Sequence, residues 1–122
     1  MIKIEELRIG NWVFDQDCEP YYFQIEQIRK DIGDSLWVYY RNGSIKCKVP
    51  EPIPLTEEIL LKCGFEKQGF YFLNRNSALM QMEISLSRKC FISSLLAIEI
   101  KHLHQLQNLY FCLVGKELNI EL

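Results

Sequence analysis

Three prolines within five residues, in the segment PEPIPL at residues 50–55, divide this chain more firmly than any other feature. Proline has no backbone N–H, and its fixed φ angle suits neither a helix interior nor a central strand. The segment therefore predicts a stiff, extended connector between two parts of the fold. We place the boundary there, with residues 1–52 and 53–122 as two subdomains of one compact unit.

The first part contains a strong β-hairpin signal. The segments DSLWVYYR and SIKCKV flank Asn42–Gly43, the residue pair that best adopts the positive φ angles of a two-residue hairpin turn. In SIKCKV, Ile45, Cys47 and Val49 alternate with lysines, so this strand is expected to have one buried face and one solvated face.

Two further segments of the first part, LRIGNWVFD and YYFQIEQIRK, also have strand patterns. In the second of them, Phe23, Ile25 and Gln27 are expected to share a face. Trp12, Phe23 and Trp37 are the aromatic residues expected to fill the core. Four short strands with one tight hairpin predict a small SH3-like antiparallel β-barrel over residues 1–52.

The second part predicts a mixture of helices and strands, which makes the whole chain an α+β protein. In LTEEILLKCGF, Thr56 is the expected N-cap of a helix and Gly64 lies just past its end. The segments GFYFLNRN and LMQMEISLS predict a second hairpin, and KCFISSLLAIEI predicts one or two more strands. A closing helix is expected from Lys101 to Val114, ended by Gly115.

His102 and His104 invite a metal or catalytic interpretation that their spacing does not favour. Helical ligand pairs are three or four residues apart, whereas two residues apart the side chains diverge by about 200° of arc. One apolar stripe of this helix is predicted from Leu103, Leu106, Leu109 or Tyr110, and Leu113. We therefore expect both histidines to be exposed and structural.

The chain has no recognisable catalytic motif: GxSxG, HExxH, the phosphate loop and GxGxxG are all missing from the sequence. It has five cysteines, an odd number with wide spacing and no CxxC pair, so reduced thiols, no bound metal and no cofactor are expected. We predict a protein that is not an enzyme. A site that pairs a cysteine with His102 or His104 in space is the least favoured alternative. The five cysteines are Cys18, Cys47, Cys63, Cys90 and Cys112.

Aromatic and basic residues concentrate in the first part. In each of the two Tyr–Tyr pairs, at least one ring is expected to face outward, because alternate residues of a strand point to opposite faces. Exposed tyrosines beside lysine and arginine predict a groove for a peptide or for unpaired bases. Two polar residues of the closing helix form a second candidate surface. The candidate binding residues are Tyr21, Tyr22, Tyr39, Tyr40, Arg41, Lys46, Lys48, Gln105 and Asn108.

The formal net charge of −2 gives no general attraction to polyphosphate. The first ten residues carry charges where a signal peptide has an apolar run, and no apolar stretch reaches the length of a membrane span. A cytoplasmic protein that does not bind membranes is therefore expected.

Three blocks, ELRIGNWV, PIPLTEEILLKCGFEK and IKHLHQLQNLYFCLVGKELNI, resemble a small protein family of Bacteroides-type gut bacteria and their phages and mobile elements. The blocks cover a little over a third of the chain. The resemblance implies a small intracellular protein of phage or plasmid origin, and it implies no catalytic residue or ligand.

The sequence leaves three functions open. The first is a non-catalytic interaction or adaptor module whose partner is a protein or a peptide. The second is a nucleic-acid-binding accessory protein that uses the tyrosine-rich, basic barrel face. The third is an enzyme with a Cys–His site.

Overall fold

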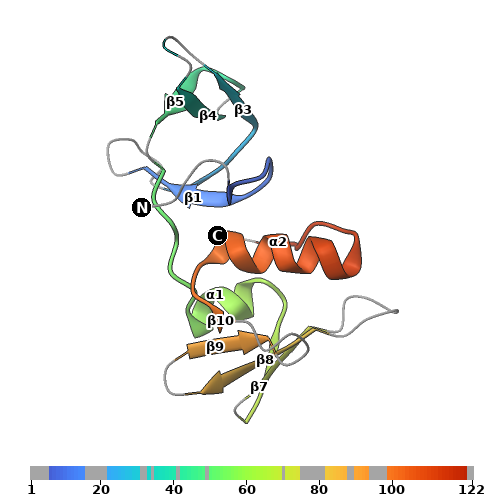
Figure 1. The fold of residues 1–122 in the computed structure, drawn as a ribbon. Helices are drawn as coiled ribbons and strands as arrows, with labels where there is room; N and C mark the ends of the chain where they lie inside the picture. Colours follow the sequence, from blue (N-terminus) through green and yellow to red (C-terminus); the bar gives the residue numbers. More distant parts are fainter. Residues whose placement is uncertain are drawn as a thin grey trace. The chain divides into compact units, whose positions relative to one another are not determined.

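A computed structural model shows that the chain forms two compact units, Met1–Ile53 and Pro54–Leu122. The division falls inside the proline segment. Both helices and several antiparallel sheets are present, so the predicted α+β class is confirmed (Figure 1). The structure describes residues 6–15, 22–30, 33, 35–40, 42–48, 50–69, 71–74, 82–87, 90–93 and 99–120.

Unit 1 contains two small antiparallel sheets. One pairs β1 with β2, and the other has the order β3-β4-β5. Among the strands that the structure describes, this pairing does not form a closed barrel. The strands are β1 (Trp12–Phe14), β2 (Tyr22–Gln24), β3 (Gln27–Lys30), β4 (Leu36–Tyr40) and β5 (Ile45–Cys47).

The hairpin between β4 and β5 forms where the sequence predicts it. Asn42 has a φ angle of 57° and Gly43 one of 80°, the left-handed values that a type I′ turn requires. The Asn42 N–H also donates to Oε2 of Glu26 at 2.7 Å. This turn sets the register, in which Tyr39 lies opposite Lys46.

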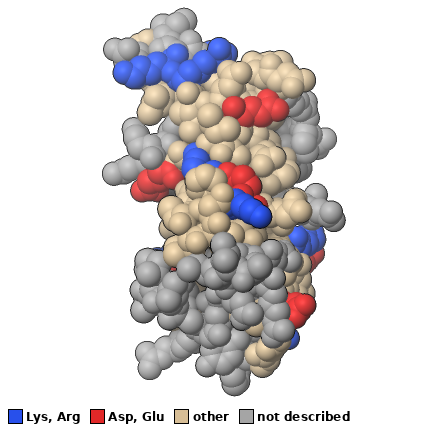
Figure 2. Space-filling model, turned by 90° about the vertical axis from the view of Figure 1, so that its right-hand side faces the viewer, with Lys and Arg blue, Asp and Glu red and all other residues tan. Residues whose placement is uncertain are grey.

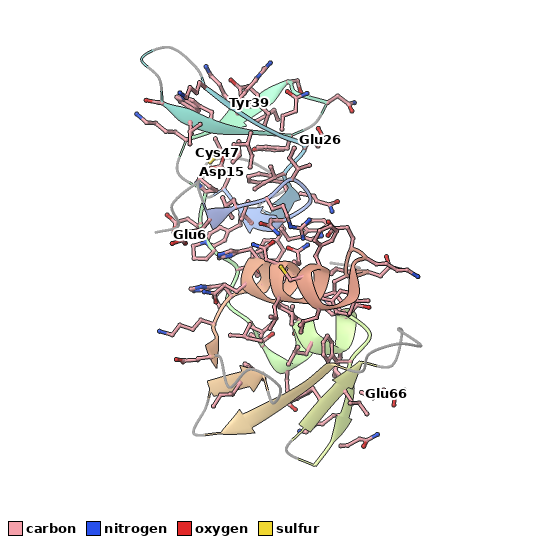
Figure 3. The ribbon with its side chains drawn as sticks, turned by 45° about the vertical axis from the view of Figure 1, so that its right-hand side comes forward. Glu6, Asp15, Glu26, Tyr39, Cys47 and Glu66 are labelled. Carbon is pink, nitrogen blue, oxygen red and sulfur yellow. The ribbon has the colours of Figure 1, made fainter. Side chains whose placement is uncertain are left out.

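The core of unit 1 lies on the inner faces of its strands (Figure 3, where Cys47 is labelled). The rings of Phe23 and Tyr40 stack there with centroids 3.8 Å apart. Phe23 is buried as predicted, but Trp12 and Trp37 are only half-buried and do not belong to this core. The buried members of the core are Leu7, Val13, Phe23, Ile25, Val38, Tyr40 and Cys47.

Phe23, Ile25 and Gln27 were predicted to share a face, and this prediction is wrong for Gln27. Phe23 and Ile25 are buried, whereas Gln27 is exposed and its neighbour Ile28 packs against the core. The reason is a break between β2 and β3 at residues 25 and 26, across which the alternation shifts by one residue.

Unit 2 contains one five-stranded antiparallel sheet of order β10-β9-β8-β7-β6. Figure 1 shows both helices on the same side of this sheet. The pairing of β7 with β8 confirms the second hairpin, and β9 and β10 confirm two strands in KCFISSLLAIEI. The strand β6 was not predicted. The strands are β6 (Glu66–Gln68), β7 (Tyr71–Asn74), β8 (Met82–Ser87), β9 (Cys90–Ser93) and β10 (Glu99–Ile100).

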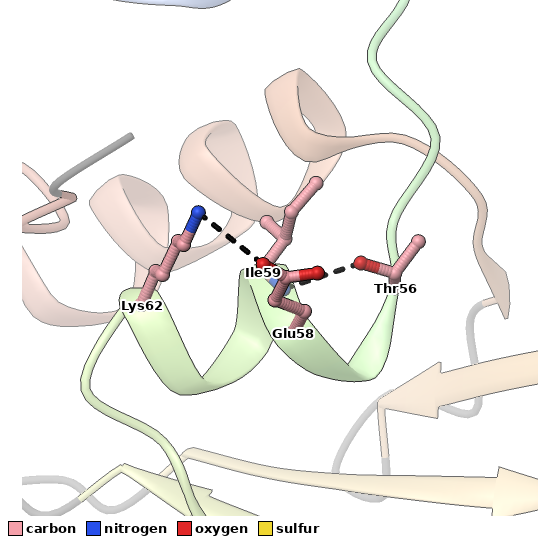
Figure 4. A network of polar contacts seen from close by, with 4 residues as sticks. All are labelled: Thr56, Glu58, Ile59 and Lys62. Carbon is pink, nitrogen blue, oxygen red and sulfur yellow. Dashed lines mark hydrogen bonds and ion pairs between the residues drawn. The ribbon is translucent and has the colours of Figure 1, made fainter.

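Helix α1 (Glu57–Lys62) begins and ends at the predicted residues (Figure 4). The Thr56 hydroxyl accepts a hydrogen bond from the Ile59 N–H at 3.2 Å. At the other end, Gly64 has a φ angle of 85°, and the Phe65 N–H donates back to the Leu60 carbonyl at 3.1 Å. These bonds satisfy backbone groups that a helix end otherwise leaves without partners.

Helix α2 (Leu103–Val114) confirms the predicted closing helix. Gly115 ends it with a φ angle of 80° and donates its N–H to the Phe111 carbonyl at 2.8 Å. Leu103 and Leu106 are fully buried on its apolar side. Within the described ranges, no helix is long and apolar enough to cross a membrane.

Candidate binding surface on the three-stranded sheet

The outer face of the β3-β4-β5 sheet brings three cations and two aromatic rings together. Val38 and Tyr40 of β4 point to the core, so the alternate residues of that strand lie on the outer face. The register places Arg29 opposite Trp37 and Tyr39 opposite Lys46. We call the set Arg29, Trp37, Tyr39, Lys46 and Lys48 the basic aromatic face.

Each cation of this face lies over an aromatic ring. The guanidinium carbon of Arg29 is 3.8 Å from the centroid of the Tyr39 ring. The Lys46 Nζ is 4.7 Å from the Trp37 ring, and the Lys48 Nζ is 6.0 Å from the same ring. The negative π face of an aromatic ring attracts a cation at these distances, by about 0.5–1 kcal/mol at an exposed site. The Tyr39 and Trp37 rings therefore attract the three positive charges to the outer face of the sheet.

Lysine and arginine side chains gather in a band at the top of the view in Figure 2, at the height where Figure 1 places β3, β4 and β5. Lys46 and Lys48 are both exposed, as predicted, and so is Arg29. Within the part of the chain that the structure describes, Arg29 and Lys48 form no ion pair with a carboxylate. Their positive charge is therefore directed to solvent.

In the pair Tyr39–Tyr40 one ring lies on the outer face, as predicted, but neither ring is exposed. Only 6% of Tyr39 and 2% of Tyr40 is exposed. Tyr40 points into the core and stacks on Phe23. Tyr39 is on the outer face, as strand alternation requires, but the Arg29 guanidinium covers its ring. A long cationic side chain can bury an aromatic ring in this way without any apolar layer above it.

The other tyrosine pair contributes less to this surface than the sequence predicts. Tyr22 is exposed, but it lies on β2, and its ring meets the edge of Phe14 with centroids 6.3 Å apart. Tyr22 therefore belongs to the other sheet of unit 1. Tyr21 and Arg41, the other predicted binding residues here, lie outside the described residues.

Two residues of the basic aromatic face, Arg29 and Trp37, were missed as binding residues. The sequence predicts that Trp37 fills the core and assigns no role to Arg29. The hairpin register carried the missing signal. The Asn42–Gly43 turn aligns β4 with β5 so that Tyr39 lies opposite Lys46. Because alternate residues of a strand share a face, Trp37 and Tyr39 then lie on the same face as the lysines.

Trp37 also has an unusual polar atom. Its indole Nε1 is buried, and it has no hydrogen-bond acceptor in the described structure. A buried donor without a partner costs about 1–3 kcal/mol. A rearrangement that gave this N–H an acceptor would therefore be favoured.

The predicted second surface, Gln105 and Asn108, belongs to unit 2. The Gln105 side chain serves its own helix, because its Oε1 accepts the N–H of Lys101 at 2.9 Å and that of His102 at 3.1 Å. Asn108 is half-buried in the middle of α2. Gln105 therefore acts first as a helix cap, in the manner of a capping box.

The prediction that both histidines are exposed is wrong for His104, of which 3% is exposed. His102 is the N-cap of α2 and has extended φ and ψ angles of −132° and 154°, so helical spacing does not apply between the two residues. Their rings stack with centroids 5.7 Å apart and planes 9° apart. The Nδ1 atom of His104 is buried without a hydrogen-bond partner among the described residues.

Burial disfavours the charged form of His104. Burial, with a smaller contribution from the charge of neighbouring His102, lowers the pKa of His104 from 6.5 to about 4. The pKa of His102 is also lowered, first by burial and then by Lys101. At neutral pH the His104 imidazole is therefore uncharged.

The cysteines whose side chains the structure describes are Cys47, Cys63 and Cys112, and none of them forms a disulfide. Cys47 and Cys63 are buried. Burial raises the pKa of Cys63 from 9.0 to about 12, which keeps this thiol protonated and unreactive at neutral pH. Within the described ranges, no three His, Cys, Asp or Glu side chains group as metal ligands.

Comparisons of the chain with protein-family models, with curated proteins and with solved structures each return no match. The functional proposal therefore rests on the geometry of the described side chains.

Proposed function

We propose that the chain is a non-catalytic interaction module whose basic aromatic face binds an anionic polymer. One observation carries the proposal: three cations lie over two aromatic rings on a single face of a three-stranded sheet. Anionic polymers bind such faces because several charges are neutralised at once and bound counterions are released. The formal charge of −2 concerns the whole chain and does not oppose a local positive field.

The Tyr39 ring contributes to this function by fixing one of the cations, Arg29. A free lysine or arginine side chain loses rotamer freedom when it binds a ligand. Contact with Tyr39 at 3.8 Å already restricts the Arg29 guanidinium before any ligand arrives. Less entropy is then lost on binding, which increases the affinity.

We also propose an SH3-like arrangement for unit 1. Its support is the pairing of β1 with β2, of β3 with β4 and of β4 with β5, with only residues 25 and 26 between β2 and β3. Beyond β5, Glu51 exchanges two backbone hydrogen bonds with Phe14 of β1, at 3.0 and 2.9 Å. Such a circuit of short strands is typical of small barrels that bind ligands on an exposed sheet face. The cytoplasmic location and the phage or mobile-element origin stay predictions.

The proposal is tested with heparin as a generic polyanion. We expect the full chain to bind labelled heparin at low ionic strength, and the affinity to fall as salt is added. The triple variant Arg29→Gln, Lys46→Gln, Lys48→Gln is expected to lose at least about tenfold in affinity, since each phosphate-like contact contributes separately.

A matched control removes the same amount of charge elsewhere. Lys62→Gln, Lys101→Gln and Lys116→Gln together also remove three positive charges, from exposed positions of unit 2. This variant is expected to bind within about twofold of the unchanged chain, because its lysines lie outside the face. Equal affinities for the two triple variants, or no binding of heparin or of any other polyanion at low salt, would overturn the proposal.

A further inference from the structure

Both nucleic acids and acidic peptides are anionic polymers, but the basic aromatic face is not equally suited to them. An acidic peptide needs cations and hydrogen-bond donors, and it gains little from a flat ring beneath the cations. A nucleic acid offers phosphates for the cations and, in addition, planar bases for the rings. Trp37 and Tyr39 lie in the same face as the three cations, and this combination favours a nucleic acid.

The two rings differ in how easily a base can reach them. Tyr39 is 6% exposed beneath a guanidinium 3.8 Å away, so it is closed in the free protein. Trp37 is half-buried, and the cations above it are the ends of flexible lysine side chains at 4.7 and 6.0 Å. An ammonium group can leave the indole when a phosphate attracts it, and the ring is then uncovered. Trp37 is therefore the ring most open to stacking.

The buried Nε1–H of Trp37 also supports this ring as the one that binds a base. It has no acceptor among the described residues, so the indole is not held in place by a hydrogen bond. Because this N–H is buried, an acceptor oxygen of a bound strand can reach it only if the indole shifts when a base stacks on the ring. The indole of Trp37 is thus held by no hydrogen bond through its N–H, and two flexible lysine side chains lie over its ring.

A duplex cannot use this ring. Its bases stack on one another and present only edges, whereas an unpaired base has an open face. A three-stranded sheet of short strands is also broader than an element that enters a groove, where a single helix or two-stranded ribbon fits.

We infer that the anionic polymer is a single-stranded nucleic acid, that a base stacks on Trp37, and that Arg29, Lys46 and Lys48 contact its phosphates. The inference rests on the proposed function, since it names the ligand of the same face. Lys46 and Lys48 cover the ring in the free protein and move to phosphates in the complex.

The test compares three labelled probes on the full chain at one salt concentration: oligothymidylate of roughly 12 nucleotides, a duplex of the same length, and heparin. We expect the single strand to bind most tightly. Trp37→Leu should lose about 5- to 150-fold in affinity for the single strand, the equivalent of one base–aromatic stack. The same variant should bind heparin within about twofold of the unchanged chain, and Trp37→Phe should keep most of the affinity for the single strand.

Fluorescence gives a second measurement that does not depend on Trp37→Leu folding normally. The chain has two tryptophans, so Trp12→Phe leaves Trp37 as the only one, and Trp37→Phe leaves Trp12. Oligothymidylate should quench the emission of the first variant and leave that of the second unchanged.

Two results separate the further inference from the proposed function. Equal affinity for single strand, duplex and heparin, or equal quenching of both single-tryptophan variants, would overturn the inference and leave a general polyanion-binding face. Failure of all three probes to bind would overturn both.

Discussion

The basic aromatic face of unit 1 and the first turn of α2 in unit 2 both place nitrogen groups against rings, with opposite results. On the face, guanidinium and ammonium groups lie over Tyr39 and Trp37 while remaining open to water. At the start of α2, the rings of His102 and His104 stack on each other, and one of them is buried. Positive charge is stabilised at the first place and disfavoured at the second.

The difference shows what hydration contributes. A cation on an exposed ring keeps most of its hydration and gains the attraction of the π face. A buried imidazole that became protonated would carry its charge without the hydration that it has in water, and the buried Nδ1 of His104 has no described acceptor to replace it. We therefore expect changes on the face to alter ligand binding more than folding, and changes in the first turn of α2 to alter folding.

The largest effect is expected from the apolar anchor of α2. Leu106→Ala should lower the free energy of unfolding by about 2–5 kcal/mol, because the side chain is fully buried and its truncation leaves a cavity. Denaturant unfolding measures the difference. Leu109→Ala is the matched control, since Leu109 is half-buried in the same helix and should cost less. Equal costs for the two would contradict the observed burial of α2.

The second effect is a dependence of stability on pH. Since the pKa of His104 is about 4 in the folded protein and 6.5 for an ordinary histidine, the unfolded chain binds more protons between these values. The contribution of uncharged His104 to the free energy of unfolding is fully present above pH 6.5. The free energy of unfolding should fall by about 3 kcal/mol as the pH drops to 4. Unfolding curves across this range test the prediction.

The control for the pH effect is His104→Leu, which should show a flatter pH dependence over the same window. Carboxylates titrate there too, so the difference between the two proteins is the quantity to compare. His102→Gln should change the curve less, because His102 is half-buried. An unchanged slope in His104→Leu would show that the imidazole is not the responsible group.

A smaller effect is expected at the cap of α2. Gln105→Ala removes the acceptor of two backbone N–H groups and should cost about 1 kcal/mol. Gln105→Glu keeps the acceptor and adds a negative charge at the positive end of the helix, so it should restore the stability. Thermal unfolding of both variants measures the loss of stability and its restoration. A glutamate variant as unstable as the alanine variant would rule out the capping role.

The smallest effect on folding is expected on the face. Lys48→Gln should change the free energy of unfolding by less than about 0.5 kcal/mol, because its Nζ is 6.0 Å from the Trp37 ring and exposed. Lys46→Gln, at 4.7 Å, should cost slightly more. Denaturant unfolding of the two variants compares them. A cost above about 1 kcal/mol for Lys48→Gln would mean that the face is part of the folding core.

Local signals in the sequence predicted the elements they control directly. Asn42–Gly43 predicted its turn because few residues tolerate two successive positive φ angles. Thr56 and Gly64 predicted the limits of α1, since a hydroxyl and a missing Cβ are what helix ends require. These features depend on a few neighbouring residues and need no knowledge of the fold.

Features that depend on distant partners could not be predicted in the same way. Tyr39 is buried because Arg29, ten residues earlier, covers its ring. His104 is buried beside His102 because the N-cap leaves the helical conformation, which a spacing rule for helices does not include. β6 has three exposed residues and no apolar alternation, so only its pairing with β7 identifies it as a strand.

The two outer strands of the five-stranded sheet have a consequence for the behaviour of concentrated protein. An outer strand has unpaired backbone groups that can join another chain and begin a fibril. Here β6 is three residues long and carries Glu66 (labelled in Figure 3) and Lys67, while β10 is two residues long and carries the exposed Glu99. A second chain that docked on either edge would bury these charges. The sheet is thereby protected against growing by addition of further molecules.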